Sequence, residues 1–156
     1  MYTKCTEEFD YTHVQVNVPS AVQPHGLGVL ENMEKEAAEE AGIPPHLARK
    51  AVAAGAVSYT ASYTYSSGAR GLKQDVLFVF DLELPEDFVP TAVDGEVEKF
   101  ELMEAGQVMA LVGLTDEYKD NCNLVLIDFF IRHGLLDPGA PGYLDLVAGV
   151  RRGKLA

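Results

Sequence analysis

The chain is poor in cysteine and in positive charge. Cys5 and Cys122 are its two cysteines among 156 residues, and such sparse, widely separated cysteines are typical of a reducing compartment. Twelve Lys and Arg residues stand against 24 Asp and Glu residues, which gives a formal net charge of −12. This balance argues against nucleic acids and membranes as partners, because both anionic surfaces need clustered cations on the protein.

The chain also has no apolar run of about 18 residues and no signal-peptide or transit-peptide pattern. Their absence predicts a soluble chain that is intracellular, and cytoplasmic by default. An organellar location applies instead if a longer parent protein carries a transit peptide. The length of 156 residues predicts one domain that can bury a core without help from disulfides or metal.

Among the features that are present, the most informative is an acidic stretch at residues 31–42. It predicts a short helix that ends at Gly42, because the prolines that follow cannot continue it. At 100° per residue, one side of this helix is an apolar stripe that packs on a core. The members of that stripe are Leu30, Met33, Ala37 and Ala41.

Three carboxylates, Glu36, Glu39 and Glu40, occupy the adjoining arc of this helix, with Lys35 as the only cation nearby. Like charges at this spacing cost a helix about 0.2–0.5 kcal/mol per pair. Oxygen ligands of this kind are what a hard divalent cation prefers. From the helix alone, two interpretations stay open: a metal site and a solvated acidic face.

The remaining periodicities predict strands and helices in an order typical of an α+β sandwich. The expected strands are residues 13–18, 56–65, 75–84 and 97–103, and the expected further helices are residues 46–52, 104–112, 121–133 and 143–152. The nearly continuous apolar run at 76–80 predicts a strand buried on both faces. Phe129, Phe130 and Ile131 are expected in the core, and Cys122 is expected to be a small buried residue.

The segment Lys35–Ile43 resembles the second half of the Nudix box, which is written G-x5-E-x7-R-E-U-x-E-E-x-G-U with U a bulky aliphatic residue. Lys35 stands where the pattern has Arg, and Ala37 is small for the position U. In the first half, Ala21 stands at the glycine of the motif and Leu27 at its first glutamate.

Beyond the box, the chain resembles the Nudix group associated with thiamine pyrophosphokinase-like proteins, over residues 21–150. The similar stretches are Gln23–Leu27, Glu31–Asn32, Gly42–Pro44, Gly55–Tyr59, Gly71–Phe78, Asp81–Pro90, Asp94–Phe100, Asp128–Gly134 and Pro141–Tyr143. The resemblance implies the Nudix fold, an α/β/α sandwich with a mixed sheet. It divides the chain into an N-terminal segment at 1–20, with one predicted strand, and a Nudix hydrolase-like domain at 21–156.

Similar proteins carry an additional domain and the first strands of the sheet before the box. Residues 1–20 are too few for both, so two alternatives stay open. Either the chain is an altered or truncated form that lacks these N-terminal strands, or its sheet is completed differently.

The resemblance also implies an activity, the metal-dependent cleavage of a small diphosphate to the monophosphate. Thiamine diphosphate or a damaged analogue is the expected substrate, and Mg²⁺ or Mn²⁺ is the expected cofactor. Glu36, Glu39 and Glu40 are implied as metal ligands and catalytic residues. Glu96 is implied as a further ligand or base, with a surface turn as its alternative. A homodimer is a further option.

The positions that look substrate-facing in similar proteins are Ser58, Tyr59, Lys73 and Gln74, and Lys73 could contact phosphate as a point charge. His25 could also contact a phosphate, with an exposed loop histidine as its alternative. Lys35 cannot reproduce the planar fork of the arginine that it replaces. The departures at Ala21, Leu27 and Lys35 therefore favour an alternative function. In that alternative, the chain is a catalytically weakened Nudix domain that serves as a ligand-binding or protein-interaction module.

Overall fold

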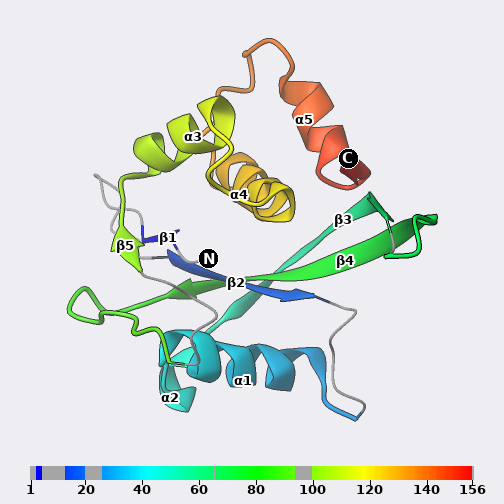
Figure 1. Ribbon diagram of the computed structural model, residues 1–156. Helices are drawn as coiled ribbons and strands as arrows, with labels where there is room; N and C mark the ends of the chain where they lie inside the picture. Colours follow the sequence, from blue (N-terminus) through cyan, green and yellow to red (C-terminus); the bar gives the residue numbers. More distant parts are fainter. Residues whose placement is uncertain (1–2, 5–12, 20–25, 65, 94–99, 156) are drawn as a thin grey trace.

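The computed structural model describes residues 3–4, 13–19, 26–64, 66–93 and 100–155. Its central sheet lies between two layers of helices, and Figure 1 shows α1 and α2 on one face with α3, α4 and α5 on the other. The α/β/α sandwich expected from the sequence is therefore confirmed. The helices are α1 (Val29–Ala41), α2 (Pro45–Ala48), α3 (Ala105–Leu114), α4 (Asp120–Arg132) and α5 (Tyr143–Gly149).

The sheet is mixed, as expected. Its order is β2-β4-β3-β6, and the central pair β3–β4 is an antiparallel hairpin in which Val57 faces Leu77 across the strands. Strand β2 pairs antiparallel with β4, whereas β6 pairs parallel with β3. The strands are β2 (His13–Pro19), β3 (Val52–Thr64), β4 (Arg70–Glu83) and β6 (Gly153–Leu155). A second, two-stranded parallel sheet joins β1 (Thr3–Lys4) to β5 (Glu101–Leu102).

Alternation along β4 fills the core on both sides of the sheet. Leu77 and Val79 join the cluster formed with Val125 of α4, and Phe80 and Leu82 join the cluster formed with α1. The strand is thus covered on both faces, as its apolar sequence predicts. Phe129 and Phe130 are buried against α3, and Ile131 is partly buried against the α4 side of the sheet.

Helix α1 owes its position to its apolar stripe. Met33, Ala37 and Ala41 are fully buried and pack with residues of β4. The helix ends at Gly42, which has φ 63° and donates its backbone N–H to the carbonyl oxygens of Ala37 and Ala38. A left-handed residue at this position is the common way for a helix to stop, and glycine adopts it without a steric penalty.

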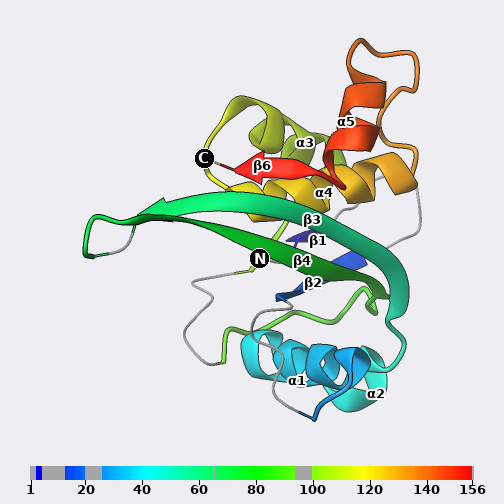
Figure 2. The same cartoon turned by 90° about the vertical axis from the view of Figure 1, so that its right-hand side faces the viewer.

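Several predicted boundaries were wrong. Helix α2 ends at Ala48 rather than at residue 52, and β3 already begins at Val52, with a bulge between Ala53 and Gly55. The last predicted helix ends at Gly149, and the chain then forms β6, which Figure 2 shows beside β3. Cys122 is half-buried rather than buried. No helix of the described residues is long and apolar enough to span a bilayer.

Candidate functional site

The acidic arc lies on α1, beside the stripe that holds this helix on the sheet. Glu36 and Glu40 are half-buried and Glu39 is exposed. Because Met33 and Ala37 are fixed in the core, the backbone beneath these carboxylates is rigid. A helix packed in this way can present charged groups at a constant spacing, which a binding or catalytic site requires.

Lys35 places its ammonium group between two of these carboxylates. Its Nζ lies 2.5 Å from Oε2 of Glu39 and 3.4 Å from Oε1 of Glu36. The hydrogen bond to Glu39 is the main cause that raises the pKa of Lys35 above its usual value. The arc therefore carries a counter-charge, so the repulsion expected among its carboxylates is smaller than the sequence suggested.

The described residues include no group of three or more His, Cys, Asp or Glu side chains arranged to hold a metal ion. Even so, the chemistry of the arc suits a divalent cation. Glu36 and Glu39 reach the same cationic atom, Nζ of Lys35, so the ammonium marks a position where two carboxylates meet one positive charge. Carboxylate oxygens are the donors that Mg²⁺ and Mn²⁺ prefer.

Asn32 is a polar residue within the buried part of α1. The residue is 2% exposed, and its Oδ1 atom has no hydrogen-bond partner among the described residues. It stands one helical turn before Glu36. Sequence reasoning did not select this residue, although an asparagine inside a helix is a signal, since asparagine is a poor helix former.

The predicted substrate residues Tyr59 and Lys73 lie on the other face of the sheet, toward α4. Tyr59 packs with the cluster that contains Val125 and donates its hydroxyl to Oδ2 of Asp75 at 2.9 Å. Lys73 lies 3.0 Å from the same carboxylate oxygen. The sheet therefore separates these two residues from the carboxylates of α1.

Burial raises the pKa of Tyr59, and its hydrogen bond to Asp75 raises this pKa further. Ser58 lies in the middle of β3 and donates its hydroxyl to the backbone oxygen of Arg151 at 2.6 Å. His25 and Glu96, two further predicted site residues, lie outside the described residues, as does Ala21.

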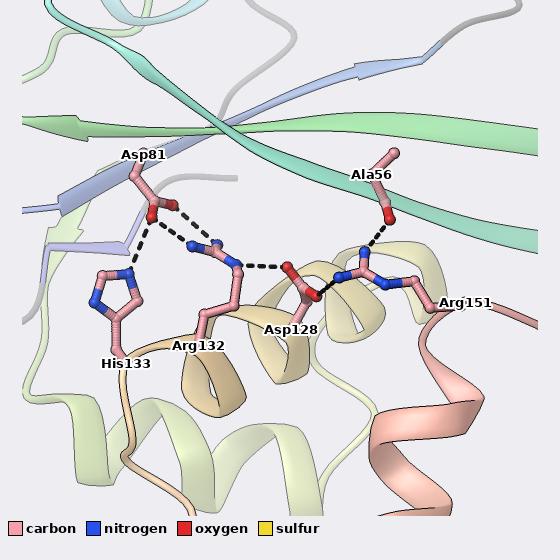
Figure 3. Close-up of polar contacts among 6 residues, drawn as sticks. All are labelled: Ala56, Asp81, Asp128, Arg132, His133 and Arg151. Carbon is pink, nitrogen blue, oxygen red and sulfur yellow. Dashed lines mark hydrogen bonds and ion pairs between the residues drawn. The ribbon is translucent and has the colours of Figure 1, made fainter.

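A chain of charged groups connects β4 to α4 on the face opposite α1 (Figure 3). We call it the Arg132 network; its members are Asp81, Asp128, Arg132, His133 and Arg151. Arg132 makes a bidentate contact with Asp81, with N–O distances of 2.5 and 3.0 Å, and donates from Nε to Asp128 at 2.7 Å. His133 Nε2 lies 3.0 Å from Asp81.

Arg151 extends the network to the edge of the sheet. It pairs with the second oxygen of Asp128 at 3.0 Å and donates to the backbone oxygen of Ala56 in β3. Burial alone would raise the pKa of Asp81, but hydrogen bonds from Arg132 and His133 outweigh it and lower this pKa. The sequence did not indicate the pair of Arg132 with Asp81, because pairing across 51 positions leaves no signal in a single sequence.

Comparison with known proteins gives two strong matches. The chain is 52% identical over 130 residues to Nudix hydrolase 24, chloroplastic, of Arabidopsis thaliana, and 49% identical over 128 residues to Nudix hydrolase 20, chloroplastic, of the same plant. These alignments cover 83% and 82% of this chain. An uncharacterized protein of Saccharomyces cerevisiae is 36% identical over 133 residues, which cover 80% of this chain and 39% of the yeast protein.

No family model matches the chain. The aligned regions make up 34% and 33% of the two plant proteins, so the chain spans about a third of the length of these relatives. Within that third, the identity is high and the observed α+β architecture agrees with the Nudix fold. Together, these findings support the assignment of this chain to the Nudix superfamily.

Proposed function

We propose that the chain is a Nudix-type pyrophosphohydrolase that cleaves a small diphosphate to its monophosphate, with Mg²⁺ or Mn²⁺ as cofactor. The best candidate substrate is thiamine diphosphate or a damaged analogue, which follows from the resemblance to the thiamine pyrophosphokinase-related group. One observation on this chain supports a metal-dependent reaction best. Glu36 and Glu39 converge on a single cationic atom from a helix that is fixed to the core.

In this proposal, Glu36, Glu39 and Glu40 hold the metal ion. When bound, the ion would neutralise charge on the diphosphate and lower the pKa of a water molecule for attack at phosphorus. The role of α1 is to keep the three carboxylates at a fixed spacing, since Met33, Ala37 and Ala41 anchor it. Lys35 is a competing cation, because it occupies Glu39 when no metal is bound.

The proposal also includes the other predicted site residues, and we expect them to differ in their contribution to the reaction. Glu96 is a candidate ligand or base, and His25 a candidate phosphate contact. Tyr59 and Lys73 lie across the sheet from α1, so we expect their contribution to substrate binding to be small. An organellar location is proposed if a longer parent protein carries a transit peptide, in line with the names of the two plant relatives.

The test is inorganic phosphate release from thiamine diphosphate by the purified chain, with Mg²⁺ and with EDTA. Glu39→Gln and Glu40→Gln should each abolish the Mg²⁺-dependent rate while leaving the far-UV circular dichroism spectrum unchanged. Glu34→Gln is the matched control on the same helix, because Glu34 pairs with Arg49 at 3.2 Å rather than with Lys35. Wild-type rates in both Glu39→Gln and Glu40→Gln would refute the assignment of the site.

A second candidate function is a ligand-binding or interaction module without turnover. The 2.5 Å contact between Lys35 and Glu39 favours it, because an ammonium group that stays in place would hinder metal binding. The two candidates separate in the same assay. A module without turnover binds thiamine diphosphate in equilibrium dialysis but releases no phosphate at any Mg²⁺ concentration.

A further inference from the structure

Asp75 of β4 is a buried carboxylate on the face of the sheet opposite the acidic arc. The residue is 4% exposed and lies directly across the hairpin from Tyr59. The Tyr59 hydroxyl donates to Oδ2 at 2.9 Å, and the Lys73 ammonium lies 3.0 Å from this same oxygen. The other oxygen, Oδ1, has no hydrogen-bond partner among the described residues. One oxygen of Asp75 therefore takes both contacts and the other takes neither.

The neighbours of Asp75 do not satisfy this second oxygen. Tyr59 has a single O–H, which it donates to Oδ2, and the side chain of Asn121 at the start of α4 hydrogen-bonds Tyr59. Leu77 and Ala61, two positions along the hairpin strands on the same side of the sheet, carry no donor. A buried charge is costly unless its hydrogen-bonding groups are paired. Asp75 is therefore unfavourable as a residue that only fills the core.

Lys73 connects this buried carboxylate to the surface. Its ammonium contacts Asp75, whereas its side chain as a whole is 52% exposed. The lysine side chain is flexible, and its ammonium is strongly hydrated when it points into solvent. Another cation can therefore take the place of this ammonium when Lys73 rotates outward, without a shift of β4 or α4.

We propose that Asp75 is the centre of a second binding site, which takes a planar cation of the amidinium class in place of the Lys73 ammonium. An amidinium, or a protonated heterocycle with an N–H beside its amino group, carries two parallel N–H donors on one charge. Such a pair binds both oxygens of a carboxylate at once. One donor would bind Oδ1, and the other would bind Oδ2 beside the Tyr59 hydroxyl. The sheet separates this site from α1, so the inference does not depend on the proposed hydrolase activity.

The experiment measures binding of benzamidine to the intact chain by isothermal titration calorimetry, with thermal melts alongside. Benzylamine is the matched probe, because it has the same ring and charge but a single ammonium. We expect benzamidine to bind more tightly than benzylamine. Asp75→Asn keeps the shape and removes the charge, so it should weaken benzamidine binding by at least about tenfold. Glu83→Gln changes an exposed carboxylate on the same strand and should bind benzamidine like the wild type.

Lys73→Met keeps Asp75 and protects the test against misfolding of Asp75→Asn. Without its cation the buried carboxylate is destabilising, so the Tm of Lys73→Met without probe should fall. Benzamidine should then bind more tightly than to the wild type and raise this Tm by more. Unchanged or weaker binding in Lys73→Met, wild-type binding in Asp75→Asn, or no binding to the wild type would each overturn the inference. Equal affinity for benzamidine and benzylamine would overturn it as well. None of these results bears on phosphate release, so the proposed function stands or falls separately.

Discussion

Removing the charged group of Arg132 should destabilise the chain strongly. Arg132 makes two contacts with Asp81 and one with Asp128, and the side chains of these partners are 17% and 2% exposed. Arg132→Met keeps most of the side-chain volume, but among the described residues it leaves Asp81 paired only with His133 and Asp128 paired only with Arg151. Breaking a buried ion pair on one side costs about 3–5 kcal/mol, and for a chain of this size the Tm should fall by roughly 6–20 °C.

The assay is urea unfolding followed by circular dichroism, with Arg49→Met as the control. Arg49 pairs with Glu34 at the surface, and its side chain is 69% exposed, so its loss should cost at most about 1 kcal/mol. The double variant Asp81→Leu/Arg132→Met should recover much of the lost stability, because no unpaired charge then remains at Asp81. Equal midpoints for Arg132→Met and Arg49→Met would refute the reasoning.

The Arg132 network also predicts that the stability of the folded chain depends on pH in the acidic range. The pKa of Asp81 in the folded chain lies below its ordinary value of 3.8, so the unfolded chain binds a proton more readily. The stabilisation from Asp81 is therefore fully present above that value and is lost as the pH falls through the lower folded value. Urea midpoints of the wild type should drop below about pH 4, and Arg132→Met should show a smaller drop over the same range.

Three further predictions concern α1. Lys35→Met should tighten Mg²⁺ binding in a titration followed by Tm, because it removes the ammonium that occupies Glu39; an unchanged affinity would show that Lys35 does not compete. Glu39→Gln should change the Tm without metal by only a few degrees, since the pair is exposed and such pairs contribute at most about 1 kcal/mol. Gly42→Ala should cost about 1–2 kcal/mol, because Gly42 has φ 63°. An added Cβ meets the Thr91 oxygen at an acceptable 3.5 Å, so Gly42→Asn, which tolerates this backbone, should cost less.

The elements whose sequences carry a clear period were predictable. Helix α1 has a glycine stop as expected, and Met33, Ala37 and Ala41 of the predicted apolar stripe are buried. The prediction for Leu30 was wrong, since this residue is 45% exposed, and the helix begins at Val29 rather than at residue 31. The β3–β4 hairpin followed from two strand-like runs around a turn rich in glycine and serine. In these segments, local propensity and tertiary packing favour the same structure.

The elements that depend on distant partners were not predictable. Strand β6 comprises Gly153–Leu155, and its pairing with Tyr59–Ala61 is set by the fold rather than by its own sequence. The bulge between Ala53 and Gly55 lies beside Arg151, whose guanidinium nitrogens are 3.9 and 4.0 Å from where a Cβ on Gly55 would stand. The residue types in one segment do not reveal contacts with a segment that lies far away in the sequence.

For the candidate site, the sequence indicated residue types but not the full spatial arrangement of the side chains. The spacing of Glu36 and Glu39 placed both on one arc, and the same spacing rule applied to Lys35 indicates the i, i+4 pair that the structure contains. Strand alternation shows that Tyr59 and Lys73 share a face with their neighbours two positions away. It cannot show which face meets α1, so their separation from the acidic arc became visible only in three dimensions.

The parallel pairing of β6 with β3 has a consequence for solubility. Without β6, the backbone groups of β3 at Tyr59–Ala61 would be open to a strand of another molecule, and exposed strand edges of this kind promote aggregation. Arg151 extends the cover by occupying the carbonyl oxygen of Ala56, and the Ser58 hydroxyl bonds to the backbone of Arg151. The segment after α5 therefore covers this part of β3 and leaves a strand of three residues at this edge of the sheet, which offers little backbone for pairing with another molecule.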